Sequence, residues 1–197
     1  MQKFLIVLLF MPFALFAQDD ARDEWQKPDA IMDSLGIRSG MYIGEAGAGS
    51  GYFTFFLAER VGETGRVYAN DIDEQGLDII SSRAQKEGFD NIITIPGEVE
   101  DPLFPDSTLD MVVMMKAFHD FTEPVKWMDN VIADLKPGAK LAIIDPVPEK
   151  VDFWKSHFMS KEEVLEIMSG TGFELVHIFT FLPRDNIYLY QLKSSPD

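Results

Sequence analysis

The segment at residues 41–51, with the sequence MYIGEAGAGSG, constrains the fold of this chain more than any other feature. A short apolar run ends at Glu45, and three glycines in alternate positions lead into an amphipathic stretch at 52–61. A second apolar run, at 66–71, ends in another carboxylate, Asp71. Glycine permits positive φ and a close approach of a ligand to the backbone, and a following helix offers free N–H groups. The pattern therefore predicts strand, tight turn, helix and strand, with a nucleoside-binding site at the turn.

The spacing of these glycines distinguishes two classes of nucleotide cofactor. The dinucleotide fingerprint G-x-G-x-x-G places its last glycine where this chain has Tyr52, one residue after Gly51. Glu45 stands two residues before the first glycine, where a carboxylate repels a pyrophosphate but attracts a cationic amino-acid end. S-adenosylmethionine (SAM) has such an end. The acid-x-G-x-G-x-G motif therefore resembles the first motif of the class I SAM-dependent methyltransferases, and the alternative is a glycine-rich turn that binds no ligand.

This resemblance covers roughly residues 25–193 and is most specific over 41–71. It implies that the glycine loop and the acid before it hold the methionine part of SAM. The acid after the second strand would accept bonds from the ribose hydroxyls, and the segment at 97–99 would face the adenine. The residues that the resemblance assigns to the cofactor are Glu45, Gly47, Ala48, Gly49, Gly51, Asp71, Ile72, Glu98, Val99 and Lys116.

Strands and helices alternate along most of the chain, which predicts an α/β fold with a parallel sheet. An uninterrupted apolar run such as MVVMM at 111–115 is typical of a strand that is buried on both faces. Strands are expected at 41–45, 66–71, 92–96, 111–116 and 140–145, and helices at 29–35, 52–61, 74–87 and 124–135.

The end of the chain departs from this alternation. Ser160 begins a capping box, S-K-E-E, which opens a helix that ends at Ser169. The runs at 173–181 and 187–192 are joined by only five residues, too few for a parallel crossover, so they must pair antiparallel. Five parallel strands closed by an antiparallel hairpin form the Rossmann-like, doubly wound, seven-stranded methyltransferase fold. A dinucleotide-binding domain would instead add a parallel sixth strand.

The beginning of the chain predicts a secretory signal peptide at residues 1–17. Lys3 supplies a basic start, residues 4–16 carry no charge, and Ala17 is a small residue at the junction. This apolar run is too short to span a membrane, so after cleavage no spanning segment is expected; a buried N-terminal helix is the alternative. Export to the periplasm or the exterior conflicts with a cofactor that is made in the cytosol. We divide the remainder into a polar tether at 18–28, a methyltransferase domain at 29–193 and a tail at 194–197.

Composition excludes several other classes of function. The chain has no cysteine, which excludes disulfides, thiol catalysis and cysteine-based zinc sites. Its formal net charge of −16 repels phosphate backbones, so no nucleic acid is expected as a partner. The three histidines stand singly, without the H-x-x-x-H spacing of a metal site, so no metal is expected either.

The segment K-A-F-H-D-F at 116–121 resembles the motif at which the family places substrate-facing and catalytic groups. His119 would take a proton from the attacking nucleophile, unless it is a loop histidine bonded to a carbonyl group, and Asp120 would orient it or cap the next helix. Asp145 follows the fifth strand and would bind a polar substrate or bond to loop N–H groups. The aromatic stretch at 153–158, with Trp154 and His157, would line the acceptor pocket or serve in packing.

Together these features predict a SAM-dependent methyltransferase that acts on an O, N or C nucleophile of a small-molecule acceptor. The chain is similar to quinone and other small-molecule methyltransferases, but no residue selects among these acceptors. Two alternatives are a non-catalytic nucleoside-binding module of the cell envelope and, third, an NAD-dependent oxidoreductase. The acceptor and the oligomeric state are left open.

Overall fold

The computed structural model describes residues 21–193. The signal peptide predicted at 1–17 and the tail at 194–197 lie outside the described residues, as does the start of the predicted tether. Among the described residues, no helix combines the length and the apolar character that a membrane crossing needs.

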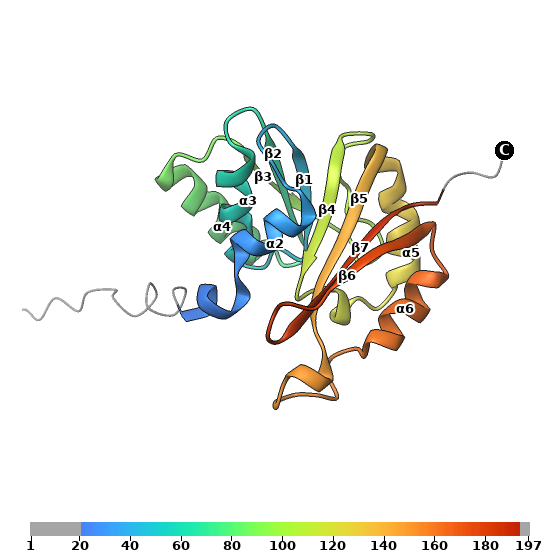
Figure 1. The fold of residues 1–197 in the computed structure, drawn as a ribbon. Helices are drawn as coiled ribbons and strands as arrows, with labels where there is room; N and C mark the ends of the chain where they lie inside the picture. The colour runs from blue at the N-terminus through green and yellow to red at the C-terminus, as the bar shows by residue number, and fades with distance from the viewer. Residues whose placement is uncertain (1–20, 194–197) are drawn as a thin grey trace, which may run out of the picture.

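A seven-stranded sheet in the order β3-β2-β1-β4-β5-β7-β6 forms the centre of the molecule (Figure 1). The first five strands pair in parallel, whereas β7 pairs antiparallel with both β5 and β6. The predicted fold class is therefore confirmed. The strands are β1 Tyr42–Ala46, β2 Arg66–Asp71, β3 Ile92–Pro96, β4 Leu109–Met115, β5 Leu135–Pro146, β6 Phe173–Phe179 and β7 Asp185–Leu192.

Helices cover both faces of this sheet, with α2, α3 and α4 on one side and α5 and α6 on the other (Figure 1). Their bounds are α2 Pro28–Leu35, α3 Tyr52–Val61, α4 Glu74–Glu87, α5 Pro124–Asn130 and α6 Lys161–Ser169. The helix expected at 124–135 is shorter than its pattern indicated, because after Asn130 the chain tightens into a 3₁₀ helix, Val131–Asp134, and then enters β5.

The apolar run in β4 shows why both faces need a cover. Successive side chains of a strand point to opposite faces, so Val112 and Met114 join the core under α5 and α6. Met111, Val113 and Met115 join the core under α2 and α3. A strand that is buried on both faces cannot alternate apolar with polar residues, and this explains its unbroken apolar sequence.

Capping residues define several helix ends. Ser160 and Glu163 form the predicted capping box of α6, and the Asp73 side chain caps α4 by accepting the Gln75 N–H. The helix expected from Asp29 begins one residue earlier, at Pro28, and Lys27 at its N-cap position makes no side-chain cap. Asp29 instead lies in the first turn and pairs with Arg60 of α3 at 3.0 Å.

Part of the segment expected to be a polar tether is a packed helix. Residues 21–26 are helical, and Gln26 is fully buried, where its side-chain amide donates to Asp185 at 2.6 Å. The Trp25 ring lies against Lys116 and Arg184, with each cationic group 4.1 Å from the ring centroid. The polar composition suggested solvation, but here the polar groups find partners on the folded domain.

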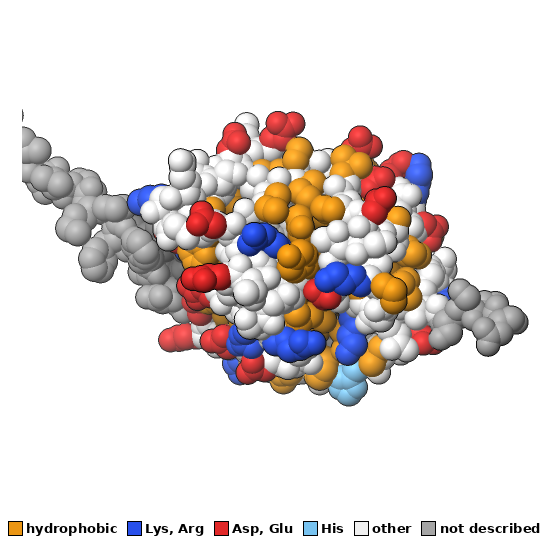
Figure 2. Space-filling view, turned by 90° about the horizontal axis from the view of Figure 1, so that it is seen from above, with side chains coloured by type: hydrophobic (Ala, Val, Ile, Leu, Met, Phe, Trp, Pro, Cys, Tyr) orange, Lys and Arg blue, Asp and Glu red, His pale blue; other side chains and the backbone are white. Residues whose placement is uncertain are grey.

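One face of the molecule is mixed in charge despite the acidic composition. Figure 2 shows the molecule from above, where acidic, basic and hydrophobic side chains are interspersed. Basic side chains on this face do not gather into one continuous patch.

Candidate active site

The glycine loop after β1 needs backbone conformations that other residues rarely adopt. Gly47, Gly49 and Gly51 have φ values of 72°, 55° and 93°. A Cβ atom on Gly47 would overlap the Cβ of Ala117, whereas a Cβ on Gly49 would meet nothing within 4 Å. Gly51 has a packing role, because a Cβ there would lie 2.8 Å from Ile80 of α4. Of the three glycines, Gly49 therefore leaves open space for a ligand.

Hydrogen bonds to the end of β2 hold this loop in place. The N–H groups of Gly47 and Ala48 both donate to the carbonyl oxygen of Asn70 at 2.9 Å. The Gly49 N–H donates to Asp71 Oδ2 at 2.7 Å, and Asp71 Oδ1 accepts the Asp73 N–H at 2.9 Å. Each carboxylate oxygen of Asp71 keeps a second lone pair for a ligand hydroxyl group.

Glu45 lies at the end of β1 with only 2% of its surface exposed. Burial raises the pKa of its carboxyl group to about 8, although the Thr54 hydroxyl, which donates to Oε2 at 2.5 Å, opposes this shift. The negative charge of Asp71 adds to the rise, and Arg22 opposes it. Glu45 is thus a protonated carboxyl group near neutral pH that a nearby cation could ionise.

A cleft of about 390 Å³ opens beside the loop, at the carboxyl ends of the parallel strands. Ile72 and Val99 expose 65% and 52% of their surfaces here, so the cleft presents two apolar side chains next to acidic groups. Together with the open space at Gly49, this combination fits the adenosine and methionine parts of SAM. The lining residues are Gly47, Gly49, Asn70, Asp71, Ile72, Glu98, Val99, Lys116, Ala117, Asp120, Phe121, Thr122 and Trp127.

A second cavity, of about 300 Å³, adjoins this cleft. The two share Lys116 and Asp120 in their linings, so a molecule in one can approach a molecule in the other. We call the second one the acceptor cavity. It is lined by Lys116, His119, Asp120, Pro146, Val151, Phe153, Trp154, His157, Phe158 and Arg184.

His119 is anchored by Asp145, a buried residue of β5. Asp145 Oδ2 accepts the His119 backbone N–H at 2.9 Å and lies 3.0 Å from Nδ1 of the ring. Because the carboxylate is the acceptor, the ring proton belongs on Nδ1, and Nε2 turns away from Asp145. Burial disfavours the charged ring, but the hydrogen bond and charge of Asp145 outweigh it, so the pKa of His119 is raised. Burial also raises the pKa of Asp145, against the hydrogen bond from His119.

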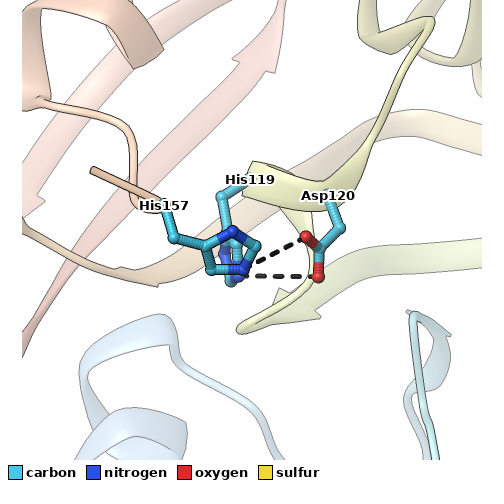
Figure 3. Close-up of side chains that lie close together, drawn as sticks. All are labelled: His119, Asp120 and His157. Atoms are coloured by element: carbon cyan, nitrogen blue, oxygen red, sulfur yellow. Dashed lines mark ion pairs between the residues drawn. The ribbon is translucent and has the colours of Figure 1, made fainter. Parts of the chain in front are cut away.

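Two further polar side chains meet His119 on its Nε2 side (Figure 3). Asp120 Oδ2 is 3.6 Å from Nε2 of His119, and Asp120 Oδ1 is 3.4 Å from Nε2 of His157. The two imidazole rings stand edge to face with their centroids 4.9 Å apart. Asp120 therefore bridges the two histidines, and it does not cap α5, whose first turn has no side-chain cap.

Lys116 occupies the wall between the cleft and the acceptor cavity. It has a left-handed backbone with φ 57°, a strained conformation for a residue with a side chain. Burial lowers its pKa to about 8, nearby Arg22 and Arg184 lower it further, and Asp185 opposes them. Trp154, on the far side of the acceptor cavity, is also left-handed, with φ 49°.

The structure brings together most of the residues that the sequence indicated, but not all of them. Gly47, Gly49, Asp71, Ile72, Glu98, Val99 and Lys116 line the cleft, and His119, Asp120, Trp154 and His157 line the acceptor cavity. Glu45, Ala48, Gly51 and Asp145 line neither, because each is engaged with neighbouring protein groups.

Sequence reasoning missed several lining residues. Asn70 and Trp127 carry no motif that separates them from ordinary core or loop residues. Arg184 comes from the turn before β7 and lies far from Lys116 along the sequence. No local sequence pattern therefore predicted that it would line the cavity.

Comparison with known proteins identifies the family to which the chain is similar. Residues 37–181 match the methyltransferase domain family. The ubiquinone/menaquinone biosynthesis C-methyltransferase of Escherichia fergusonii is 28% identical over 138 residues, which are 66% of this chain and 55% of that protein. The same enzyme of Salmonella arizonae is 27% identical over 138 residues, again 66% of this chain and 55% of that protein. This chain thus spans about half the length of these curated relatives.

Solved structures show the same fold. A SAM-dependent methyltransferase from Aquifex aeolicus has a TM-score of 0.84 at 28% identity, covering 93% of this chain and 100% of that chain. The geranyl diphosphate C-methyltransferase of Streptomyces coelicolor, at 14% identity and a TM-score of 0.70, covers 85% of this chain and 76% of that chain, and it shows the fold alone. The predicted enzyme class and cofactor, a methyltransferase that uses SAM, are confirmed at the level of the family. The chain belongs to the methyltransferase domain family.

Proposed function

We propose that this protein transfers the methyl group of SAM to a small polar acceptor held in the acceptor cavity. The observation that carries the proposal is that Lys116 and Asp120 line both the cleft and the acceptor cavity and so form a wall between them. A donor in the cleft and an acceptor in the cavity would meet across this wall. Such positioning accounts for most of what a methyltransferase must contribute, because it converts an encounter into a reaction between fixed partners.

The residues of the cleft divide the work of holding SAM. Asp71 would accept a ribose hydroxyl group with its remaining lone pairs, and Ile72 and Val99 would contact the adenine ring. The open space above Gly49 would take the methionine part. We assign Glu45 an electrostatic role, because a cation over the loop would favour its ionised form.

The proposed methyl transfer would be a single displacement reaction. SAM supplies an electrophilic methyl group. A lone pair of the acceptor forms a bond to the methyl carbon while the carbon–sulfur bond breaks and its electrons stay on sulfur. The protein would exclude water and orient the acceptor. His119, whose Nδ1 is held by Asp145, lines the cavity that would hold the acceptor.

The lining of the cavity supports an acceptor that has an aromatic ring and an ionisable oxygen. Phe153, Trp154 and Phe158 offer ring faces and edges, while Lys116 and Arg184 offer positive charge to an anionic oxygen. The curated relatives named above are C-methyltransferases of ubiquinone and menaquinone biosynthesis, and the reduced, hydroquinone form of a quinone has this chemistry. We therefore propose a phenol or hydroquinone as the acceptor class.

Binding and turnover test this proposal separately. Calorimetric titration of residues 18–197 should show binding of SAM and of S-adenosylhomocysteine, and no binding of NAD. Incubation with methyl-labelled SAM and a panel of phenols and hydroquinones should release S-adenosylhomocysteine and label the product. Binding of NAD in place of SAM would contradict the proposal, and SAM binding without turnover on any panel member would favour a non-catalytic binding module.

We also propose that residues 1–17 direct export of the protein. The support is the sequence itself, with Lys3 before an uncharged apolar run and Ala17 at its end. Expression of the full chain followed by N-terminal sequencing should find a mature protein that begins at Gln18. A cytosolic protein that keeps Met1 would contradict export.

A further inference from the structure

Three side chains with metal-ligating atoms meet at one side of the acceptor cavity (Figure 3). One ring nitrogen of His119, one carboxylate oxygen of Asp120 and one ring nitrogen of His157 all lie within 4.8 Å of one another. His119 and Asp120 come from the loop after β4, and His157 comes from the loop before α6. We propose that these three residues bind a divalent transition-metal ion of the zinc class.

The distances match those that such an ion requires. Zinc binds imidazole nitrogen and carboxylate oxygen at about 2.0–2.2 Å in a tetrahedron, which separates neighbouring ligand atoms by about 3.3–3.6 Å. Asp120 Oδ2 is 3.6 Å from His119 Nε2, and Asp120 Oδ1 is 3.4 Å from His157 Nε2, so each imidazole lies at this separation from one oxygen of the carboxylate. The side chain of His157 is 49% exposed, so its ring can rotate to complete the site.

His119 is already oriented as a ligand. A histidine that binds a metal through one ring nitrogen nearly always donates its other ring N–H to a carboxylate or a carbonyl group. Here Nδ1 faces Asp145 Oδ2 at 3.0 Å, and the same oxygen holds the His119 backbone N–H. Phe158 packs edge to face on the ring, with centroids 5.0 Å apart. The lone pair of Nε2 is therefore directed at Asp120 before any ion binds.

The choice of ligands selects the metal class. Imidazole nitrogen favours zinc and its transition-metal neighbours over Mg²⁺ and Ca²⁺, which prefer oxygen ligands. Three protein ligands with an open fourth position are typical of catalytic rather than structural zinc sites. The positive charges of Lys116 and Arg184 oppose an ion in this cavity, but both stack on Trp25. The carboxylate of Asp120, at the site itself, and that of Asp145, behind the His119 ring, supply negative charge that offsets them.

The open position gives the ion a role in the reaction, and this part rests on the proposed function. An oxygen atom of the acceptor could occupy the fourth position and release its proton to water, which would leave an anionic oxygen beside the wall shared with the cofactor cleft. A metal lowers the pKa of an oxygen that it binds, so the acceptor would be nucleophilic at neutral pH. The ion would thereby fix both the position and the ionisation of the acceptor.

Metal binding can be measured without SAM and without an acceptor. Residues 18–197, prepared without a polyhistidine tag and treated with a chelator, are titrated with Zn²⁺ by calorimetry and with Co²⁺ by visible absorption. We expect one ion per chain and the visible bands of a low-symmetry Co²⁺ site. His157→Ala and Asp120→Asn should remove the bands, and Asp145→Asn should weaken Zn²⁺ binding by about 10–100-fold, as loss of an outer partner does.

His177→Ala is the matched control, because His177 is exposed on β6 and lies outside the cluster. It should bind both metals as the parent does. If His157→Ala or Asp120→Asn binds as tightly as the parent, or if the parent binds no ion, the proposal is overturned and the cluster is an imidazolium held between two carboxylates. Because SAM is absent from this titration, failure of the metal site is distinct from failure of the proposed methyl transfer, which the SAM titration tests.

Discussion

At the scale of single residues, the glycines of the loop after β1 have different structural roles. Gly47 and Gly51 allow close packing against Ala117 and Ile80, whereas Gly49 leaves open space at the cleft. Glu45 is buried, does not line the cleft, and has a raised pKa because of its burial. Substitutions therefore need to separate the backbone, packing and ligand roles of each position.

Gly49→Ala should abolish measurable SAM binding, because the new methyl group occupies the open space where the ligand would approach. The substitution also places alanine at φ 55°, which costs about 1–2 kcal/mol of stability. Gly88→Ala is the matched control, since Gly88 has φ 79° with nothing within 4 Å of an added Cβ, but caps the end of α4. Urea unfolding should show a similar loss of stability in both variants. Calorimetry should show a loss of SAM binding only in Gly49→Ala. Equal SAM affinities would place the ligand elsewhere.

Glu45 should make the ligand-free protein less stable as the pH rises. The folded state keeps the Glu45 proton up to a pKa of about 8, whereas the unfolded chain releases it near the ordinary value of 4.5. Between these values the folded state binds more protons, so the free energy of unfolding falls from pH 5 to pH 8.

Urea unfolding at pH 5 and pH 8 measures this fall, which should be smaller in Glu45→Gln. Glu59→Gln is the control, because Glu59 is exposed on the same helix-covered side, in α3. If the fall were as steep in Glu45→Gln as in the parent, another group would hold the proton.

At the scale of elements, the helical residues 21–26 pack on the strand ends. Gln26 reaches a buried carboxylate of β7, and Trp25 holds two cations that line the acceptor cavity. The segment thus shapes the cavity, although it lies outside the regular alternation of strands and helices.

Gln26→Ala should lower the free energy of unfolding by about 1.5–3 kcal/mol, because it removes a buried hydrogen bond to a charged group. It should also expose the segment to trypsin at Arg22. Glu24→Ala is the control, since Glu24 is exposed in the same segment. Urea unfolding and timed proteolysis give the two readouts. Unchanged stability and cleavage in Gln26→Ala would mean that the segment behaves as a tether.

At the scale of the whole molecule, the sheet assembles the site from distant parts of the chain. Strand β1 lies between β2 and β4, so the loops after these strands diverge and leave the cleft between them. The loop after β5 and the turn before β7 then close the acceptor cavity at the same edge. We therefore expect binding of the donor and use of the acceptor to depend on separate groups of residues.

Asp71→Ala and His119→Ala should show this separation. Asp71→Ala should weaken the binding of SAM by about 1.5–3 kcal/mol, because its hydrogen bonds to the ligand are lost. His119→Ala should leave SAM affinity within about twofold, but lower turnover at saturating SAM by about 10²–10⁴-fold. Calorimetry and release of S-adenosylhomocysteine measure the two effects. A loss of SAM affinity in His119→Ala equal to that in Asp71→Ala would show that one site serves both molecules.

The sequence by itself determined the parts that depend on local chemistry. Alternate glycines after an apolar strand specify a turn with positive φ, unbroken apolar runs specify strands buried on both faces, and a short connection specifies the antiparallel hairpin. These signals act over a few residues, so they can be read without knowing the fold. They were sufficient for the fold class, and several of the residues that they assigned to the cofactor line one cleft.

Only the tertiary structure decided which distant residues meet. Gln26 and Asp185 are 159 residues apart in the chain, and His119 and His157 belong to different loops, yet each pair is in contact. Spacing along the sequence therefore argued against a metal site, although the fold brings the His119, Asp120 and His157 side chains together. The physical reason is that local patterns encode backbone conformation, whereas a site of scattered side chains is set by which strand ends the sheet places side by side.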